Sequence, residues 1–247
     1  MPDFLIIGAQ KCGTTSLLYY LGQHPQIALS EKKEIHFFDK KYQMGLDWYE
    51  NQFPRKSDRA KITGEATPYY LFHPFVPQRV AHHYPEIKII ILLRNPVDRA
   101  YSHFWMIKSR ELEPLQTFEE AIEAEAERIE PEMSKMLSNP EYRSISYQHH
   151  SYLSRGKYYE QIQNWLRYFP TSSFWFIKTE RLKTKPIAEL EKLYLFLGIK
   201  CTLPGDLSFQ RTGEYPPMKP ETRKQLNNYF DPYNKKLKTI LGNEFTW

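Results

Sequence analysis

Short apolar runs alternate along the chain with segments whose apolar residues recur every three or four positions. The run Lys88–Leu93 is almost continuously apolar, which is typical of a strand buried on both faces of a parallel sheet. The runs that predict strands are Phe4–Ile7, Ile27–Leu29, Lys61–Glu65, Lys88–Leu93 and Ser173–Ile177. The segments that predict helices are Ser16–Gly22, Gln78–His83, Val97–Arg110, Phe118–Arg128, Gly156–Phe169, Ile187–Leu197 and Glu221–Leu241. Strands that alternate with helices predict an α/β fold with three layers around a central, mainly parallel sheet.

The chain shows no internal repeat, linker or low-complexity tract, so we expect a single domain over residues 1–247. Residues 203–220 are rich in Pro and Gly and predict an irregular segment before the last helix.

Composition excludes several classes of protein. Hydrophobic residues make up 41% and aromatic residues 15% of the 247, more than a disordered chain carries. The cysteines Cys12 and Cys201 do not make a disulfide scaffold, and no Cys/His cluster has the spacing of a zinc site. The longest apolar run is far shorter than the ~20 residues that span a bilayer, and the N-terminal stretch lacks the basic start of a signal peptide. We therefore expect a cytoplasmic protein without a membrane span.

The formal net charge of +5 is unevenly distributed. Residues 111–132 contain nine acidic residues and one Arg, which leaves 33 basic and 20 acidic residues in the remainder. The acidic stretch predicts a solvated helix face. The basic surplus indicates a polyanionic partner of unspecified kind.

The loop after the first predicted strand, GAQKCGTTS at residues 8–16, carries the clearest chemistry. Glycines let backbone N–H groups approach a phosphate, and a helix N-terminus adds partial positive charge. The alternative is an ordinary strand–helix turn with Ser/Thr caps. The loop is not that of a nucleoside triphosphatase, because Lys11 precedes Gly13 instead of following it.

With this loop in view, the chain resembles the sulfotransferases that use 3′-phosphoadenosine 5′-phosphosulfate (PAPS), in particular the heparan-sulfate type and its bacterial relatives. The resemblance rests on four segments in the family's order, which are FLIIGAQKCGTTSL, EKKEIHFFD, IIILLRNPVDRAYSHF and YFDPYNKKLKTILGNEFTW. It implies a P-loop-like nucleotide-binding fold and an enzyme that forms adenosine 3′,5′-bisphosphate (PAP) without a metal.

The resemblance also implies roles for individual residues. The catalytic residues would be Lys11 near the bridging oxygen of the donor, Glu34 as the base, and His36 beside it together with Asp39. The residues implied to bind the donor are Lys11, Cys12, Gly13, Thr14, Thr15, Ser16, Arg94, Ser102 and, as a closing cation, Arg211. Of these, Arg94 and Ser102 would hold the 3′-phosphate, and Cys12 would be a small residue of the loop.

Physical chemistry is consistent with these roles. Sulfuryl transfer resembles phosphoryl transfer, with charge growing on the bridging oxygen of the leaving phosphate. A lysine at that oxygen stabilises the charge as it develops, and a carboxylate within reach of the acceptor hydroxyl is a suitable base. An arginine fork suits a terminal phosphate.

Each residue also has an ordinary structural interpretation. Glu34 is consistent with a solvated carboxylate neutralised by Lys32 and Lys33, and His36 with a histidine of the core. Arg94 would then end a strand, and Ser102 would lie on a helix surface. The same loop would also suit a nucleotide-dependent phosphoryl transferase, and the basic surplus a non-catalytic polyanion-binding protein.

Two departures from the animal heparan-sulfate enzymes concern the acceptor. Ala66 stands where those enzymes carry a lysine, and Cys201 stands alone where they have a disulfide-flanked basic loop. We therefore expect a small-molecule, glycan or lipid acceptor, sulfated on a hydroxyl rather than an amine, and no nucleic-acid partner.

Overall fold

The computed structural model describes residues 1–57, 60–210 and 213–247. The chain divides into two compact units. The sheet unit comprises Met1–Leu93 and Gln163–Thr212, and the helical unit comprises Arg94–Ile162 and Gly213–Trp247.

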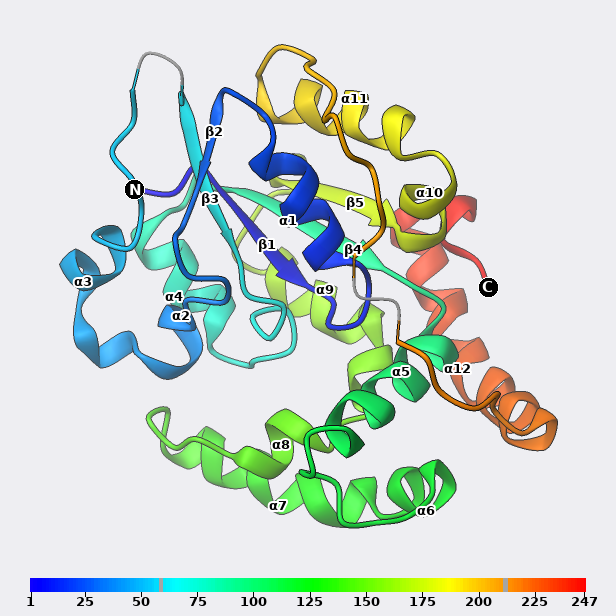
Figure 1. The fold of residues 1–247 in the computed structure, drawn as a ribbon. Helices are drawn as coiled ribbons and strands as arrows, with labels where there is room; N and C mark the ends of the chain where they lie inside the picture. Colours follow the sequence, from blue (N-terminus) through cyan, green and yellow to red (C-terminus); the bar gives the residue numbers. More distant parts are fainter. Residues whose placement is uncertain (58–59, 211–212) are drawn as a thin grey trace. The chain divides into compact units, whose positions relative to one another are not determined.

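The sheet unit is built on five parallel strands (Figure 1). They are β1 (Phe4–Gly8), β2 (Ile27–Leu29), β3 (Ile62–Ala66), β4 (Lys88–Leu93) and β5 (Phe174–Lys178), in the order β2-β3-β1-β4-β5. Helices lie on both sides of this sheet, which confirms the predicted three-layer α/β fold.

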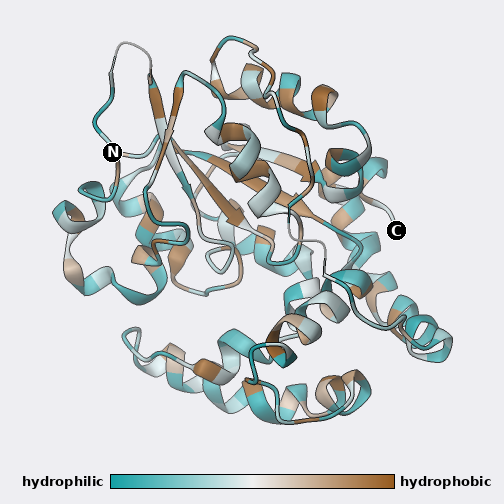
Figure 2. Cartoon of the chain, viewed as in Figure 1, coloured by the Kyte–Doolittle hydropathy of each residue, from teal (hydrophilic) through white to brown (hydrophobic). Residues whose placement is uncertain are grey.

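Burial explains why the central strands are continuously apolar. The side chains of Phe4–Ile7 in β1 and Ile89–Leu93 in β4 are 0% exposed, and Figure 2 shows these strands as hydrophobic. The pairing of β1 with β4 runs in register from Phe4 opposite Lys88 to Ile6 opposite Ile90, then shifts so that Gly8 lies opposite Ile91. The regular ladder therefore changes where β1 leads into the loop at residues 8–16.

The sheet unit contains both predicted and unpredicted helices. Helices α1 (Thr14–Gly22), α4 (Val76–His83) and α11 (Pro186–Leu197) lie where the periodicity placed them, and α11 ends at Gly198, whose φ is 76°. Three short helices were missed because a single turn carries too little periodicity to detect. They are α2 (Phe37–Lys40), α3 (Leu46–Glu50) and α10 (Thr179–Thr184).

The regular elements of the helical unit, among its described residues, are all helices. They are α5 (Pro96–Lys108), α6 (Phe118–Glu123), α7 (Glu125–Ser138), α8 (Ile145–His149) and α12 (Pro220–Leu241); α9 (Tyr158–Leu166) begins in this unit and ends in the sheet unit. One apolar cluster joins α5, α6 and α12 through Phe104, Phe118 and Phe230.

The single helix expected at Phe118–Arg128 is wrong. Thr117 and Glu120 form a capping box that starts α6, and the helix ends at Glu123 before α7 begins at Glu125. The carboxylate of Glu125 is buried and accepts the backbone N–H groups of Leu153 at 2.5 Å and Ser154 at 2.8 Å. This inward contact lies at the start of α7, directly after the break between the two helices.

The acidic stretch is also not wholly a solvated face. Glu113 is 3% exposed and pairs with Arg128 at 2.9 Å while the Tyr152 hydroxyl donates to it at 2.6 Å. Acidic residues at such positions help to hold the helical unit together, whereas Glu111, Glu123, Glu127 and Glu130 are exposed.

The irregular segment before α12 is anchored to the sheet unit over its first half. The hydroxyls of Tyr19 and Tyr20 on α1 donate to Asp206 at 2.7 Å and to the carbonyl of Leu207 at 2.9 Å. These bonds fix residues 206–210 against α1 without regular secondary structure.

Candidate active site

The candidate site of the sheet unit lies at the carboxyl ends of its parallel strands, the edge at which α/β proteins bind ligands. The loop at residues 8–16, called here the first loop, follows β1. Residues 30–41, called here the Glu34 segment, follow β2. Thr67 follows β3 and Thr179 follows β5, so the same edge gathers four segments that are distant in sequence.

The first loop has glycines at two positions where neighbouring side chains leave no room for a Cβ atom. A Cβ on Gly8 would lie 2.7 Å from Cβ of Leu71, and a Cβ on Gly13 would lie 2.9 Å from Cζ of Phe209. Gly13 has a φ of 87° and precedes α1, and Lys11 has a φ of 69°. The loop therefore depends on backbone shapes that favour glycine and on close packing.

The start of α1 presents donors. The first intrahelical bond joins the N–H of Leu17 to the carbonyl of Gly13, so the N–H groups of Thr14, Thr15 and Ser16 precede the helical ladder. Donors in this arrangement, with the positive end of the helix dipole, fit the phosphate end of a nucleotide.

The hydroxyls of this helix start differ in what they contact. Thr15 is half-buried, and its Oγ1 accepts a hydrogen bond from Nζ of Lys33 at 2.6 Å. Ser16 is 0% exposed, and its Oγ accepts the N–H of Gln210 at 2.9 Å. Thr15 thus faces the Glu34 segment, whereas Ser16 secures residue 210.

Thr179 holds the first loop from the end of β5. Its Oγ1 lies 2.7 Å from the carbonyl oxygen of Cys12 and 2.9 Å from that of Leu93, and it shares its proton between them. Cys12 itself is 0% exposed, with its Sγ 3.8 Å from the carbonyl of Gln10, so its side chain fills the loop as expected.

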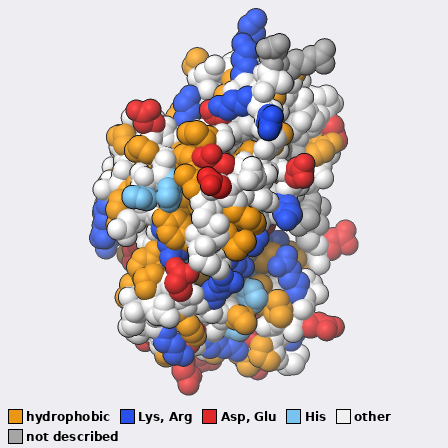
Figure 3. All heavy atoms as spheres, turned by 90° about the vertical axis from the view of Figure 1, so that its left-hand side faces the viewer, with side chains coloured by type: hydrophobic (Ala, Val, Ile, Leu, Met, Phe, Trp, Pro, Cys, Tyr) orange, Lys and Arg blue, Asp and Glu red, His pale blue; other side chains and the backbone are white. Residues whose placement is uncertain are grey.

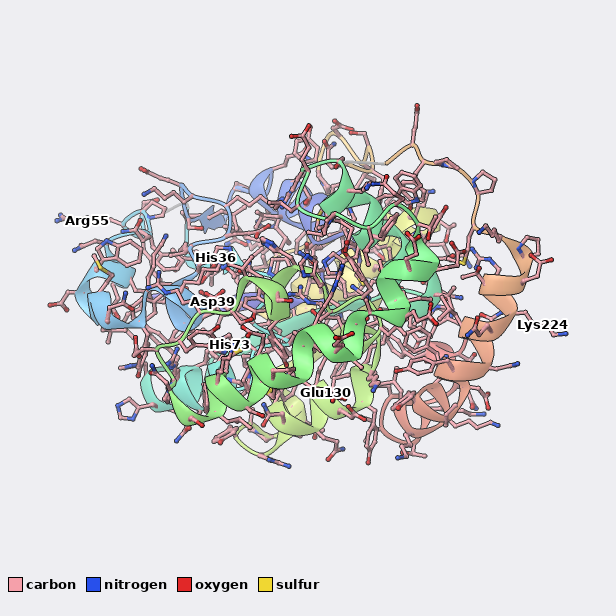
Figure 4. The ribbon with its side chains drawn as sticks, turned by 90° about the horizontal axis from the view of Figure 1, so that it is seen from below. His36, Asp39, Arg55, His73, Glu130 and Lys224 are labelled. Carbon is pink, nitrogen blue, oxygen red and sulfur yellow. The ribbon has the colours of Figure 1, made fainter. Side chains whose placement is uncertain are left out.

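The Glu34 segment places two carboxylates around one imidazole; Figure 4 labels the imidazole of His36 and one of the two carboxylates, that of Asp39. Nδ1 of His36 lies 2.7 Å from Oδ2 of Asp39, and Nε2 lies 3.4 Å from Oε2 of Glu34. Glu34 and His36 both have positive φ, 59° and 57°, a turn that residues other than glycine adopt only when their surroundings hold it.

This arrangement sets the charge of His36. Burial of the ring disfavours the charged imidazolium, but hydrogen bonds to Asp39 and then to Glu34 outweigh it and raise the pKa of His36 to about 9. At neutral pH the imidazolium therefore lies between the carboxylates of Asp39 and Glu34.

Two predicted residues belong to the helical unit. Arg94 directly follows β4 and is half-buried, and its carbonyl accepts the hydroxyl of Tyr158 at 2.9 Å. Asn95 caps α5 by accepting the N–H of Val97 at 2.9 Å. Ser102 lies two turns into α5 and is 5% exposed.

The predicted closing cation, Arg211, lies outside the described residues. Downstream of it, the ring of Tyr215 lies nearly parallel to that of Trp105, with centroids 6.2 Å apart, and the hydroxyl of Tyr101 donates to the carbonyl of Pro216 at 2.9 Å. These contacts fix residues 215–216 on α5 within the helical unit.

Sequence reasoning missed two residues of this edge. Lys33 was interpreted only as a partner for Glu34, and nothing local signals its contact with Thr15. Thr179 carries a detectable signal, because a hydroxyl directly after a predicted strand belongs at the ligand-binding edge of a parallel sheet.

A family model described as a sulfotransferase domain matches residues 1–236. The chain belongs to this sulfotransferase family. The resemblance inferred from the four segments is thereby confirmed.

Relatives of this sulfotransferase include animal and amoebal proteins. It is 31% identical to the heparan sulfate glucosamine 3-O-sulfotransferase 6 of Mus musculus, over 100% of this chain and 73% of the relative. It is 30% identical to the membrane-associated sulfotransferase kil1 of Dictyostelium discoideum, over 100% of this chain and 66% of the relative. The chain thus spans a little less than two thirds of that amoebal relative.

Solved structures of sulfotransferases are also similar to this chain. A sulfotransferase from Alicyclobacillus acidocaldarius matches with a TM-score of 0.80 and 32% identity over 98% of this chain and 96% of its own. A mouse sulfotransferase complexed with PAP matches with a TM-score of 0.50 and 19% identity over 81% of this chain and 59% of its own, a likeness of fold. These matches confirm the predicted bacterial type and the fold class.

Proposed function

We propose that the protein transfers the sulfuryl group of PAPS to a hydroxyl acceptor in line and without a metal, with Glu34 as the base and Lys11 at the leaving phosphate. The observation that carries this proposal is the 2.6 Å contact between Nζ of Lys33 and Oγ1 of Thr15. It joins a loop whose N–H groups fit a phosphate to a segment that holds a carboxylate, so a PAPS molecule bound by this loop would lie beside the proposed base.

The first loop fits the 5′-phosphosulfate. Gly13, Thr14 and Thr15 would bind it through backbone N–H groups and hydroxyls, and Lys11 would stabilise the charge that grows on the bridging oxygen. The PAP bound in the distant mouse neighbour supports a donor of this kind.

Glu34 would take the proton of the acceptor hydroxyl as that oxygen attacks the sulfur, because a hydroxyl becomes acidic only during the attack. His36 would orient this carboxylate through its 3.4 Å contact, and Asp39 would hold His36. The bond between the acceptor oxygen and sulfur would form while the bond between sulfur and the 5′-phosphate oxygen breaks, and the acceptor proton would pass to Glu34. The products are PAP and a sulfate ester.

Arg94 and Ser102 would bind the 3′-phosphate. The guanidinium fork suits a terminal phosphate, and a serine hydroxyl adds a further donor. We propose that residues 1–247, which include both units, belong to a single sulfotransferase domain.

The acceptor class we propose first is a glycan hydroxyl, because the relatives include heparan sulfate glucosamine 3-O-sulfotransferases. Ala66, which ends β3 and is 1% exposed, replaces the lysine expected in the animal enzymes, so the glycan need not be heparan sulfate. Small-molecule and lipid alcohols remain in the acceptor panel for this reason.

The distribution of basic residues bears on the polyanion-binding alternative. On the face that Figure 3 shows, Lys and Arg side chains lie among acidic and hydrophobic ones and are most frequent in the lower half of the view. No helix of the described residues is both long and apolar enough to cross a bilayer. A cytoplasmic location stays a prediction.

Isothermal titration with PAP tests the donor. We expect the wild type to bind, Arg94→Ala to lose affinity by about tenfold or more, in line with a charged hydrogen-bond pair, and Arg143→Ala, an exposed arginine of the helical unit, to bind as the wild type. Absence of PAP binding by the wild type would overturn the donor assignment.

Incubation with PAPS and a panel of sugars, phenols and lipid alcohols, followed by mass spectrometry, tests the reaction. A mass gain of one sulfuryl group on a hydroxyl supports the proposal. Turnover of ATP with Mg²⁺ in place of PAPS would revive the phosphoryl-transferase alternative.

A further inference from the structure

Glu65 is a carboxylate that the proposed reaction does not use, yet it lies at the centre of a polar cluster in the sheet unit. It stands next to the end of β3 and is 0% exposed. Its Oε1 accepts the hydroxyls of Tyr49 at 2.9 Å and Tyr70 at 3.0 Å, and its Oε2 accepts the hydroxyl of Thr67 at 2.6 Å.

Two of these hydroxyls also contact the Glu34 segment. Oη of Tyr70 accepts the N–H of Phe37 at 2.9 Å and that of Phe38 at 3.4 Å. Oγ1 of Thr67 lies 3.5 Å from the N–H of His36, the long limit of such a bond. The three N–H groups belong to consecutive residues, and the first of these is His36, which like Glu34 has a positive φ.

The direction of each proton follows from the chemistry of Glu65. In its ionised form Glu65 only accepts hydrogen bonds, so each of the three hydroxyls then directs its single proton toward Glu65. The lone pairs of Thr67 and Tyr70 are then left to accept the backbone N–H groups. A side chain at position 65 that can also donate, such as glutamine, would let the hydroxyls of Thr67 and Tyr70 rotate. Their protons would then point toward the N–H groups of residues 36–38, and the hydrogen bonds to these N–H groups would be lost.

The carbonyls of the same segment are held separately. Nζ of Lys41 donates to the carbonyl of Ile35 at 3.0 Å, and Nη1 of Arg79 donates to that of Phe38 at 2.7 Å. The N–H groups of residues 36–38 therefore depend on the Glu65 cluster. The carbonyls of Ile35 and Phe38 depend on cations, and those of residues 36 and 37 accept backbone N–H groups.

We propose that Glu65 is a positioning residue, which holds the turn carrying Glu34 and His36 by fixing the hydroxyls of Tyr70 and Thr67 as acceptors. The inference rests on the proposed role of Glu34 as the base. Burial raises the pKa of Glu65 against the opposing effect of its bonds from Thr67, Tyr49 and Tyr70, so the test is made at pH 8 and repeated at higher pH, where the charged form is favoured further.

The test compares three variants in the full chain at saturating PAPS. Glu65→Gln keeps the shape but adds a donor, and Tyr70→Phe removes the link to the segment; we expect both to lower kcat tenfold or more. Tyr49→Phe is the matched control, because its hydroxyl contacts Glu65 but no backbone of the segment, and its ring keeps the 4.5 Å stacking on Phe37. We expect its kcat to stay within threefold of the wild type.

Titration with PAP separates positioning from general damage. If the cluster acts only on the Glu34 segment, affinity for PAP changes less than twofold in all three variants while kcat falls in two. An equal fall of kcat in Tyr49→Phe and Tyr70→Phe, or a wild-type kcat in Glu65→Gln, would overturn the proposal. If Glu65→Gln does not fold, the comparison of the two tyrosine variants still decides.

A double-mutant cycle with Glu34 distinguishes failure of the inference from failure of the proposed function. When Glu65 acts through Glu34, Glu65→Gln has no further effect on turnover in a Glu34→Gln background. Additive losses contradict the positioning role but leave the base in place. Full turnover by Glu34→Gln alone contradicts the base, whatever Glu65 does.

Discussion

The first loop and the Glu34 segment lie on the same edge of the sheet, but they are held in place by different means. The first loop depends on its own glycines, with Gly8 packed on Leu71 and Gly13 on Phe209. The Glu34 segment has no glycine in its turn and is held by side chains from β3, the residues after it, and α4. The conformation of a loop can be predicted from the local sequence when its own glycines determine it, but not when side chains from distant segments hold it.

The difference also concerns charge. The first loop offers backbone donors and the helix dipole, which do not titrate, and the Glu34 segment offers carboxylates and an imidazole, which do. Donor binding is therefore expected to tolerate pH changes that alter the stability and protonation of the Glu34 segment.

The largest effect is expected from Glu34→Gln. The amide no longer accepts the acceptor proton, so turnover should fall by about 10²–10⁴-fold, the range for a general base. Affinity for PAP should stay at the wild-type value, because the first loop is untouched. Steady-state turnover and calorimetry measure the two quantities.

Glu31→Gln is the matched control for this variant, because Glu31 is an exposed carboxylate of the same segment. It should turn over as the wild type. Equal losses in the two variants would mean that the charge of the segment, and not the proton acceptor at position 34, governs the rate.

The second effect concerns the pH dependence of stability at His36. Its pKa is raised from 6.5 to about 9, which corresponds to about 3 kcal/mol between the two protonation states. This stabilisation is fully present below pH ~6.5, declines as the pH rises, and is lost above pH ~9. The difference in unfolding free energy between wild type and His36→Gln should therefore shrink from pH 6 to pH 9.5 in urea titrations.

Asp39→Asn checks the cause, because it removes the 2.7 Å partner of His36. In that background the pH dependence of the same difference should weaken. A difference that is constant across the range would show that the imidazolium does not hold the segment.

Most of the sheet was predictable because its signal is local. The continuous apolar run of β4 lies at its predicted bounds, Lys88–Leu93, and α11 ends at Leu197 as predicted. The division at Ala124 was not predictable, because it depends on Glu125 reaching the backbone of residues 153 and 154. One-turn helices such as α2 are also not predictable, because four residues are too few to show a helical repeat of apolar positions.

The candidate site divides in the same way. GAQKCGTTS alone predicts a phosphate site, whereas the residues around Glu34 alone indicate an ordinary charged residue, and only the family resemblance implies that it is the base. The contacts of Lys33 with Thr15 and of Tyr70 with Phe37 join residues 18 and 33 positions apart, so no local pattern reports them.

A smaller effect is expected from Gly13→Ala. Its φ of 87° costs an alanine about 1–2 kcal/mol, and the new Cβ meets Phe209 at 2.9 Å, so affinity for PAP should fall about tenfold. Gly198→Ala is the matched control, since its φ is 76° but it lies at the end of α11. It should lower the melting temperature and leave PAP binding unchanged; a loss of PAP affinity there would mean that the effect at Gly13 is global.

The smallest effect, at Lys33, bears on whether the two regions are independent. Nζ of Lys33 lies 2.6 Å from Oγ1 of Thr15, so a donor held by Thr15 lies within reach of its charge. Lys33→Ala should weaken PAP binding about three- to tenfold, less so at high salt because the attraction is partly screened. Lys32→Ala, the exposed neighbour, should bind PAP as the wild type. If the two lysine variants bind alike, the first loop is self-sufficient. If only Lys33→Ala is weakened, the segment that holds the base also contributes to donor binding, and the two regions form one site.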